Sequence, residues 1–213
     1  MKPSLAATIA MAALTTTTTT TSAAAFAETE KFDRSAVGAL PAGWLSGVTG
    51  RGSPRWQVIA DPSAPSAPNV LNQSGVGSFP WAVRQGVVLL DGYVETRFKS
   101  ISGKEDQAGG VVWRFKDAST YYVARANANE DNVSLYYTTM GIRSTIKYVN
   151  APVPRNVWHT LRVEFEGRKI RVLLDGKTYI AAEDEHIKEA GSVGVWTKAD
   201  SVTSFDNFGF GGR

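Results

Sequence analysis

The 213-residue chain contains no cysteine. This absence excludes disulfide bonds and thiolate metal sites, so the hydrophobic core must hold the fold together unaided. It also excludes an export product anchored to lipid through an N-terminal cysteine. Histidine is nearly absent too, because His159 and His186 are the only two. Neither lies beside a serine that it could activate, so the sequence offers no Ser-His-Asp catalytic triad. The glycines near the C-terminus form a tail and not a phosphate-binding loop before a helix.

Long hydrophobic runs are scarce as well. The apolar stretch Leu5–Leu14 is about half of the roughly 20 residues that a membrane-spanning helix needs. Lys2 precedes this stretch, and Ala25-Phe26-Ala27 follows it as a small-x-small cleavage site. This arrangement predicts a signal peptide over residues 1–27 and a single mature domain over residues 28–213, with no membrane span. Export without cysteine predicts a soluble protein in a bacterial periplasm or outside the cell.

The chain also lacks a strong charge of one sign. Its formal net charge is +3 at pH 7, and removing the leader takes away only one basic residue, Lys2. The remaining basic residues are interleaved with acidic ones and form no clustered stripe. Nucleic acid is therefore not a predicted partner.

Helical periodicity is almost missing, whereas a two-residue alternation of apolar and polar side chains recurs along the chain. This alternation predicts strands at Arg55–Ala60, Tyr93–Lys99, Gly110–Lys116, Tyr121–Asn127, Val133–Thr138, Ile142–Val149, Thr160–Glu166, Lys169–Leu174, Lys177–Ala182, Ser192–Thr197 and Ser204–Phe210.

Turn residues separate these strands. Asp175-Gly176 is a strong signal for a tight hairpin, because the turn needs residues that accept a positive φ. The proline-rich segment Asp61–Asn69 predicts an ordered surface loop, and only Glu183–Glu189 could form a helical turn. Many short strands with no interior helix predict one all-β domain, a two-sheet antiparallel jelly-roll sandwich.

The hairpin Glu105–Asn127 has the most informative chemistry, because arginines and aromatic residues alternate along both of its strands. The phase of the alternation predicts that Trp113 serves the core while Arg114, Arg125 and Asn127 share a polar face. A guanidinium group presents several fixed donors, which match vicinal sugar hydroxyls or a uronate carboxylate. We therefore predict that this face binds carbohydrate.

Further candidates complete the predicted ligand face. Glu95 and Arg97 share the polar side of their strand, and Glu95 is an acid/base candidate, a hydroxyl acceptor or one half of a cross-strand ion pair. Trp81 and Trp196 are predicted as exposed stacking platforms, and the other four tryptophans as packing residues. The full predicted ligand-binding set is Glu95, Arg97, Arg114, Arg125, Asn127, Lys147 and Trp196.

Several segments resemble a known superfamily. Trp158–Phe165, Ile170-Arg171-Val172 and Asp175-Gly176-Lys177 resemble the late hairpin of laminin-G-like domains, and Gly191–Trp196 with Ser204–Phe208 resemble the closing strands. With these segments the chain resembles the concanavalin A-like lectin/glucanase superfamily, near the exported bacterial 3-keto-disaccharide hydrolase and family 16 glycoside hydrolase-like domains. The resemblance implies a curved jelly roll whose concave sheet or rim loops face a glycan.

The resemblance leaves the activity open. A family 16 enzyme carries a Glu-x-Asp-x-Glu strand, and the nearest string here, Glu164-Phe165-Glu166, lacks the third carboxylate. We expect Glu164 and Glu166 to pair with nearby arginines. A carbohydrate-recognition protein is therefore the first hypothesis. A periplasmic glycoside hydrolase using Glu95, or an envelope domain that binds a protein, are the alternatives.

One metal site remains open from the sequence. Asp33 and Asp206 lie near opposite ends of the mature chain, and terminal strands pair in jelly rolls. Two carboxylates with backbone carbonyls would suit a structural Ca²⁺ ion. The alternative is that both carboxylates accept capping and turn hydrogen bonds. No other cofactor is predicted.

Overall fold

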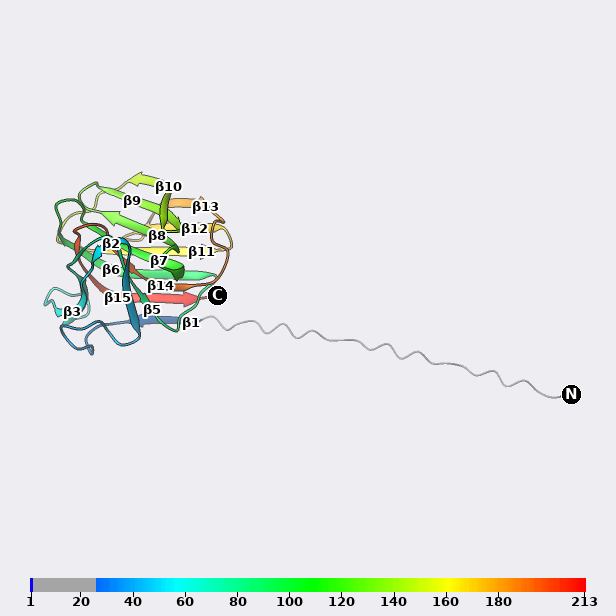
Figure 1. Ribbon diagram of the computed structural model, residues 1–213, viewed down its shortest axis with the longest axis horizontal. Coiled ribbons are helices and arrows are strands. Elements are labelled where there is room, and N and C mark those ends of the chain that lie inside the picture. Colours follow the sequence, from blue (N-terminus) through cyan, green and yellow to red (C-terminus); the bar gives the residue numbers. More distant parts are fainter. Residues whose placement is uncertain (2–25) are drawn as a thin grey trace.

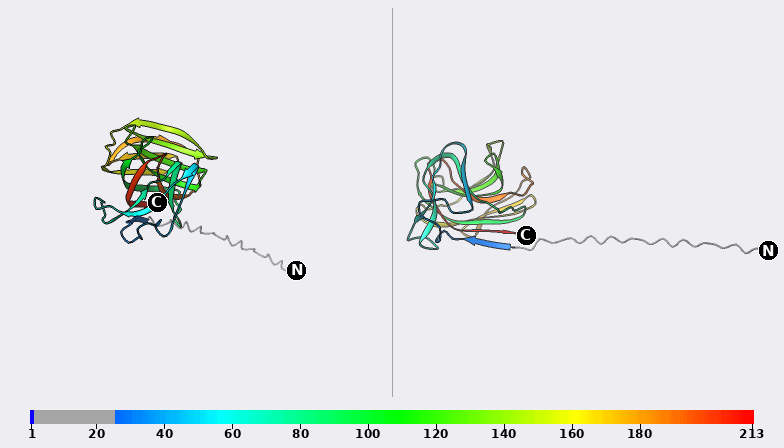
Figure 2. Two further views of the ribbon diagram at one scale, coloured as in Figure 1. Left: turned by 60° about the vertical axis from the view of Figure 1, so that its left-hand side comes forward. Right: turned by 60° about the horizontal axis from the view of Figure 1, so that its bottom comes forward.

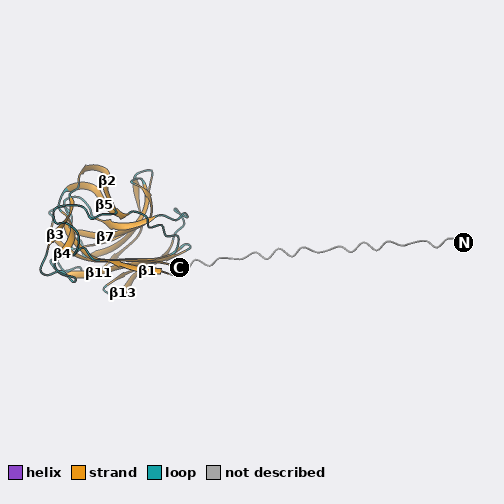
Figure 3. Ribbon diagram, turned by 90° about the horizontal axis from the view of Figure 1, so that it is seen from below, coloured by secondary structure: helices purple, strands orange, loops and turns teal. Residues whose placement is uncertain are grey.

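The computed structural model describes Met1 and residues 26–213, and this part consists of strands and loops without any helix (Figure 3). The strands are β1 Phe26–Glu30, β2 Trp44–Ser53, β3 Trp56–Ala60, β4 Asn69–Gln73, β5 Val76–Arg84, β6 Gly92–Ser102, β7 Ala108–Asp117, β8 Thr120–Asn127, β9 Asn132–Thr139, β10 Ile142–Asn150, β11 Trp158–Glu166, β12 Lys169–Leu174, β13 Lys177–Glu183, β14 Ser192–Trp196 and β15 Val202–Gly212.

The strands form two antiparallel sheets packed face to face, which Figure 2 shows as two layers. The seven-stranded sheet has the order β10-β9-β8-β7-β14-β5-β2. The eight-stranded sheet has the order β13-β12-β11-β6-β15-β4-β3, and β1 pairs with β15 beside the C-terminus (Figure 1). The predicted two-sheet jelly-roll sandwich is confirmed.

The core between the sheets follows from the two-residue alternation. Along β6 every second side chain is buried, including Val94 and Phe98. The ring of Trp113 on β7 stacks between Tyr122 and Phe165, with centroid distances of 5.2 and 5.8 Å. Each such ring contributes roughly 1.5–3 kcal/mol through removal from water. The prediction that Trp113 serves the core is thus confirmed.

The hairpin between β12 and β13 turns at Asp175 and Gly176, whose φ angles are 50° and 79°. Both values are positive, as a tight turn between right-twisted strands requires. The predicted Asp61–Asn69 loop is also ordered, since Lys99 Nζ donates to Asp61 Oδ2 and to Ser63 Oγ at 2.6 Å each.

The segment Glu183–Glu189 contains no helical turn, so this prediction is wrong. Side-chain hydrogen bonds order it instead. The Asp184 carboxylate accepts from the Tyr122 hydroxyl and from the backbone N–H of His186, and Tyr122 in turn accepts from Ile187 N. In this segment the side-chain hydrogen bonds form in place of the backbone hydrogen bonds of a helical turn.

The seven-stranded sheet is strongly curled. In a flat sheet β2 and β8 would lie four strand spacings, or about 19 Å, apart. Thr49 Oγ1 on β2 nevertheless donates to Ala118 O at 2.5 Å and accepts from the hydroxyl of Tyr121 on β8 at 2.9 Å. We call the hollow side of this sheet the concave face; it bears Phe79, Trp81, Val112, Phe115, Tyr121, Val123, Arg125, Tyr136, Arg143 and Trp196.

No helix long and apolar enough to cross a membrane occurs in the part of the chain that the structure describes. The predicted signal peptide over residues 1–27 lies outside these residues except for Met1, Phe26 and Ala27. Phe26 and Ala27 begin β1 and pair with Gly212 and Gly211.

Candidate functional site

The predicted ligand residues do not share one face. Glu95 and Arg97 lie on β6 of the eight-stranded sheet, whereas Arg125, Asn127 and Trp196 lie on strands of the seven-stranded sheet. The prediction of a single face carrying them all is therefore wrong. Alternation along a strand indicates which side chains lie on the same side of that strand, but it does not indicate the sheet to which the strand belongs.

Glu95 belongs to a network of ion pairs on the outer face of the eight-stranded sheet. Arg162, opposite Glu95 in register, donates to Glu95 Oε2 at 3.4 Å and to Glu164 Oε1 at 3.0 Å, and Arg171 donates to Glu164 Oε2 at 3.0 Å. The cross-strand ion pair, one of the alternatives for Glu95, is the arrangement present. Both carboxylates thus accept hydrogen bonds from guanidinium groups. Arg97, on the same face, forms no ion pair among the described residues.

Arg114 lies at a β-bulge and not in the regular alternation. The register of β7 against β8 shifts between Trp113 and Asp117, and the φ of Arg114 is 45°. The bulge turns its side chain towards the end of the core, where it donates to Leu90 O (3.0 Å), Ile187 O (2.8 Å) and Gly167 O (2.7 Å). The predicted sharing of a face with Arg125 is wrong, because Arg114 ties three loops together at the opposite end of β7.

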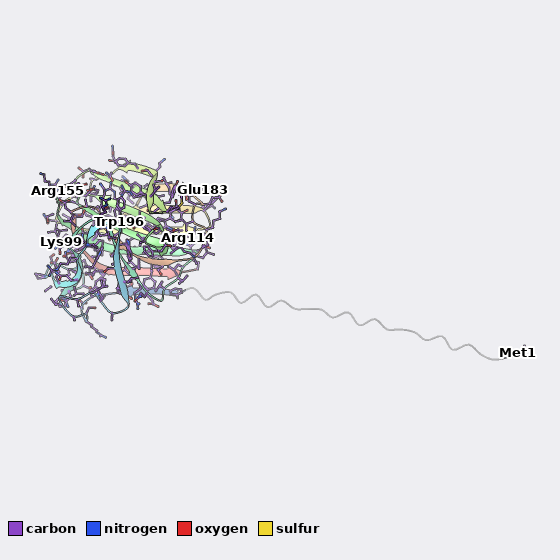
Figure 4. All side chains as sticks on the ribbon, viewed as in Figure 1. Met1, Lys99, Arg114, Arg155, Glu183 and Trp196 are labelled. Carbon is purple, nitrogen blue, oxygen red and sulfur yellow. The ribbon has the colours of Figure 1, made fainter. Side chains whose placement is uncertain are left out.

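Figure 4 shows Arg114 and Trp196 well apart on the fold. Trp196 is fully buried and Trp81 is 6% exposed, so the prediction that these rings are exposed platforms is wrong. Lys147 is exposed, but it lies opposite Leu135, a core residue, and therefore not on the concave face. The curl of the sheet buries the two tryptophans, and the sequence carries no signal for this curl.

Asp33 and Asp206 each accept hydrogen bonds from their own surroundings. Asp206 is fully buried and accepts from Ser66 N (2.6 Å), Ser66 Oγ (2.7 Å) and Asn207 N (2.7 Å). Asp33 accepts from Asn69 N at 3.3 Å. N–H and O–H donors thus occupy both carboxylate oxygens of Asp206 and one carboxylate oxygen of Asp33, which is the hydrogen-bonding alternative to the predicted ion site. Residues 26–213 contain no group of three or more His, Asp or Glu side chains arranged to hold a metal.

A buried polar network lies at one end of the concave face. The Asp106 carboxylate is fully buried and accepts from Arg125 Nη1 (2.9 Å), Asn127 Nδ2 (2.7 Å) and Lys198 Nζ (2.5 Å). Arg125 also donates to Glu130 Oε2 at 2.7 Å. The network joins β8 to the loops that precede β7 and follow β14, and it fixes Arg125 in one position.

Charges within the network hold one another ionised. Burial opposes the charge of Arg125, but Tyr136, Glu130 and Asp106 outweigh it and raise the pKa of the guanidinium. Burial likewise opposes the charge of Glu130, yet hydrogen bonds from Asn132 and Arg125 lower the pKa of its carboxyl. The Nη atoms of Arg125 and the Nδ2 of Asn127 are therefore bonded within the protein and position the rim, which differs from the ligand contact that the sequence suggested.

Gly110 allows Arg125 of the polar network and the ring of Trp196 to lie close together. Gly110 lies between Trp196 and Arg125 in register, and a Cβ on it would come within 3.2 Å of the Trp196 ring and 3.4 Å of Arg125 Cβ. Phe79 stacks on Trp196 with a centroid distance of 5.8 Å and an interplanar angle of 16°. Phe79 is half-buried, so part of its side chain remains accessible.

Arg143 on β10 also belongs to this face, although the sequence pattern did not predict it as a ligand residue. Its guanidinium carbon lies 4.3 Å from the ring centroid of Tyr136, 4.5 Å from that of Phe79 and 5.7 Å from that of Trp196. Burial and the nearby charge of Arg125 lower its pKa. Arg143 lay in a predicted strand, but only the curl of the sheet brings that strand near Phe79 on β5.

A shallow pocket of about 390 Å³ opens beside this cluster. It is lined by Phe79 and Lys198, by the exposed Glu105 and Arg51, and by Gly52, Val76, Gly77, Ser78 and Ala199. An aromatic side and charged groups of both signs thus converge at the open end of the concave face.

No family model matches the chain. A segment of 102 residues is 30% identical to the levanase of Bacillus subtilis (strain 168), and it covers 47% of this chain but only 15% of the levanase. Among solved structures, the carbohydrate binding module CBM66 from Bacillus subtilis has a TM-score of 0.64 at 22% identity, over 78% of this chain and 93% of the module.

Two further solved structures have similar folds. Bacillus licheniformis beta-glucanase has a TM-score of 0.54 at 13% identity, over 90% of this chain and 99% of the glucanase. The cellulose induced protein Cip1 has a TM-score of 0.59 at 12% identity, over 86% of this chain and 96% of Cip1. The chain has a concanavalin A-like jelly-roll fold. At these identities the likenesses establish the fold alone.

Proposed function

We propose that this protein is a carbohydrate-recognition module whose ligand binds at the open end of the concave face. The observation that carries the proposal is a pocket lined by the half-buried ring of Phe79 with Lys198 and Glu105, where the guanidinium of Arg143 lies over the same ring. An aromatic surface with a few charged groups is the composition expected of a small-ligand site.

The side chains of Phe79 and Lys198 are ordered by contacts with buried residues. Phe79 rests on the fully buried ring of Trp196, and Lys198 is held by the buried carboxylate of Asp106. A ligand that packs its C–H groups on Phe79 and bonds to the charged rim would therefore find groups that are already ordered. Such preorganisation lowers the entropy cost of binding.

Two comparisons support the choice of ligand. The similar module CBM66 is by name a carbohydrate-binding module, and the partial sequence match is to a levanase. Levan is thus the first ligand to test, with a β-glucan as the second. Within residues 26–213 the Glu95–Arg162–Glu164 network gives no support for a hydrolytic site.

The test is isothermal titration calorimetry with both glycans, using the Phe79→Ala variant and a matched control, Tyr93→Ala. Each ring has a guanidinium group over it, Arg143 at 4.5 Å from Phe79 and Arg162 at 3.9 Å from Tyr93, but the rings lie on opposite faces of the sandwich. We expect Phe79→Ala to weaken binding about tenfold, the loss for a stacking contact of ~1.4 kcal/mol, and Tyr93→Ala to change it less than about twofold.

Two results would refute the proposal: binding of neither glycan at millimolar concentration, or a loss confined to Tyr93→Ala. Release of reducing sugar from either glycan by the wild-type protein would show a hydrolase instead.

We also propose that the protein is exported and loses residues 1–27. Cleavage after Ala27 would leave Glu28, Thr29 and Glu30 of β1 paired with β15. N-terminal sequencing of the protein from a bacterial host should give Glu28 as the first residue of the exported form. Retention of the full chain in the cytoplasm would contradict this proposal without touching the binding site.

A further inference from the structure

Arg114 and Arg125 of the seven-stranded sheet are buried and Arg143 is half-buried, and the three differ in their hydrogen bonds. Arg114 donates to three carbonyls and to Asp91, and Arg125 donates to Asp106 and Glu130. Arg143 donates to no side chain or carbonyl and joins no ion pair in residues 26–213. Its Nη1 is completely enclosed and has no partner.

The surroundings of Arg143 supply rings but no counter-charge. The two nearest carboxylates of the face, Asp106 and Glu130, are held by Arg125 and Lys198. The rings of Phe79 and Tyr136 attract the guanidinium, but a cation–π contact does not satisfy its N–H groups. The enclosed N–H groups of Nη1 have lost water without gaining an acceptor, which is costly, and an anion bound beside the guanidinium would offset this cost.

The other unpaired polar atoms around Arg143 are chiefly N–H donors. Arg125 Nε and Trp196 Nε1 are both enclosed and without partners. Thr138, opposite Arg143 in register, has a hydroxyl without a partner. A sugar hydroxyl brings a donor of its own that would need an acceptor here. A carboxylate brings acceptors only and matches the planar guanidinium with two parallel hydrogen bonds.

We propose that the preferred glycan of this site is acidic, and that Arg143 binds the carboxylate of a uronic-acid residue. This inference rests on the proposed function, because it assumes that a glycan binds at the concave face. The pocket beside Phe79 accommodates the rest of the sugar, and Lys198 and Glu105 face its hydroxyls. Arg143 thus determines specificity, while Phe79 supplies contact to acidic and neutral sugars alike.

The experiment compares a trigalacturonate with its fully methyl-esterified form by calorimetry at low salt. The two ligands share one carbon skeleton and differ in charge. Wild-type protein should bind the acid at least about tenfold more tightly than the ester, the ratio that a single charge-assisted hydrogen bond provides. The Arg143→Gln variant should lose this preference, and the Arg162→Gln control, whose guanidinium also lies over a ring, should keep it.

The outcomes separate this inference from the proposed function. Equal affinity of the wild-type protein for acid and ester, with levan or β-glucan still bound, overturns the acidic preference and leaves glycan binding intact. Binding of none of these glycans overturns both. Tighter binding of a sulfated trisaccharide or of a poly-glutamate peptide than of the trigalacturonate also overturns the assignment to a uronate. Because Arg143 makes no hydrogen bond, Arg143→Gln should keep the wild-type circular dichroism spectrum, and the wild-type comparison needs no variant.

Discussion

Removal of the Asp106 carboxylate offers the strongest test of how the concave face is held together. Asp106 is fully buried and accepts hydrogen bonds from Arg125, Asn127 and Lys198. In Asp106→Ala, Arg125 would remain 3% exposed with Glu130 as its only carboxylate partner. Breaking a buried ion pair from one side costs about 3–5 kcal/mol, and the remaining Glu130 contact favours the lower end, about 3 kcal/mol.

The loss is measurable by urea denaturation and by calorimetric melting. For a domain of this size about 3 kcal/mol corresponds to a fall in Tm of about 6–12 °C. Asp106→Asn keeps the shape and one acceptor oxygen, and Lys198 can turn to solvent, so its loss should be smaller. Glu166→Ala is the control, because Glu166 and Arg213 form a pair at 3.0 Å in which each side chain is 66% exposed. Such exposed pairs contribute at most about 1 kcal/mol.

A loss in Asp106→Ala no larger than in Glu166→Ala would refute this reasoning. It would mean that the face is held by packing of its rings and not by the buried charges.

Two further predictions concern acid stability and backbone packing. Acidification should destabilise the fold. Burial opposes the charge of Asp61, Glu130 and Asp184, but hydrogen bonds and nearby cations outweigh it and hold the pKa of each carboxyl below its usual value. These carboxylates therefore contribute to the free energy of unfolding at neutral pH, and this contribution is lost as the pH falls below about 4. A Tm at pH 3 equal to that at pH 7 would contradict this. Gly194→Ala should cost about 1–3 kcal/mol in urea denaturation, because its Cβ would meet the carbonyl oxygen of Ala82 on β5, whereas Gly209→Ala, with no atom nearer than 3.7 Å, should cost much less. Equal losses in the two glycine variants would contradict the packing argument.

Much of the strand content follows from the sequence. β12 spans the predicted residues Lys169–Leu174, and β11 and β13 differ from the prediction by only one or two residues at an end. β4 was missed because its sequence, Asn69-Val70-Leu71-Asn72-Gln73, does not alternate apolar and polar residues. β2 was missed because glycines interrupt its pattern. Burial on both sides does not by itself hide a strand, because β7 and β8 are buried along almost their whole length and both were predicted from the alternation in their sequences.

The candidate site was less predictable, for three physical reasons. A bulge at Arg114 reversed the expected phase. The curl of the seven-stranded sheet buried Trp81 and Trp196 and brought Arg143 to Phe79. The bulge lies within the β7–β8 hairpin, and the curl depends on contacts between strands that are distant in the sequence. None of these effects has a signature in the local alternation.

The two faces of the sandwich show why exposure of arginines and rings is a poor guide to a ligand surface by itself. Both faces place a guanidinium over an aromatic ring, Arg162 over Tyr93 and Arg143 over Phe79. Arg162 is already neutralised by Glu95 and Glu164, so a ligand would have to compete with two carboxylates there. Arg143 joins no ion pair in the described chain, and its enclosed Nη1 has no hydrogen-bonding partner. Because Arg97 on the outer face also has an enclosed Nε without a partner, it is the position of Arg143 over Phe79, beside a pocket, that distinguishes the concave face as the proposed ligand surface.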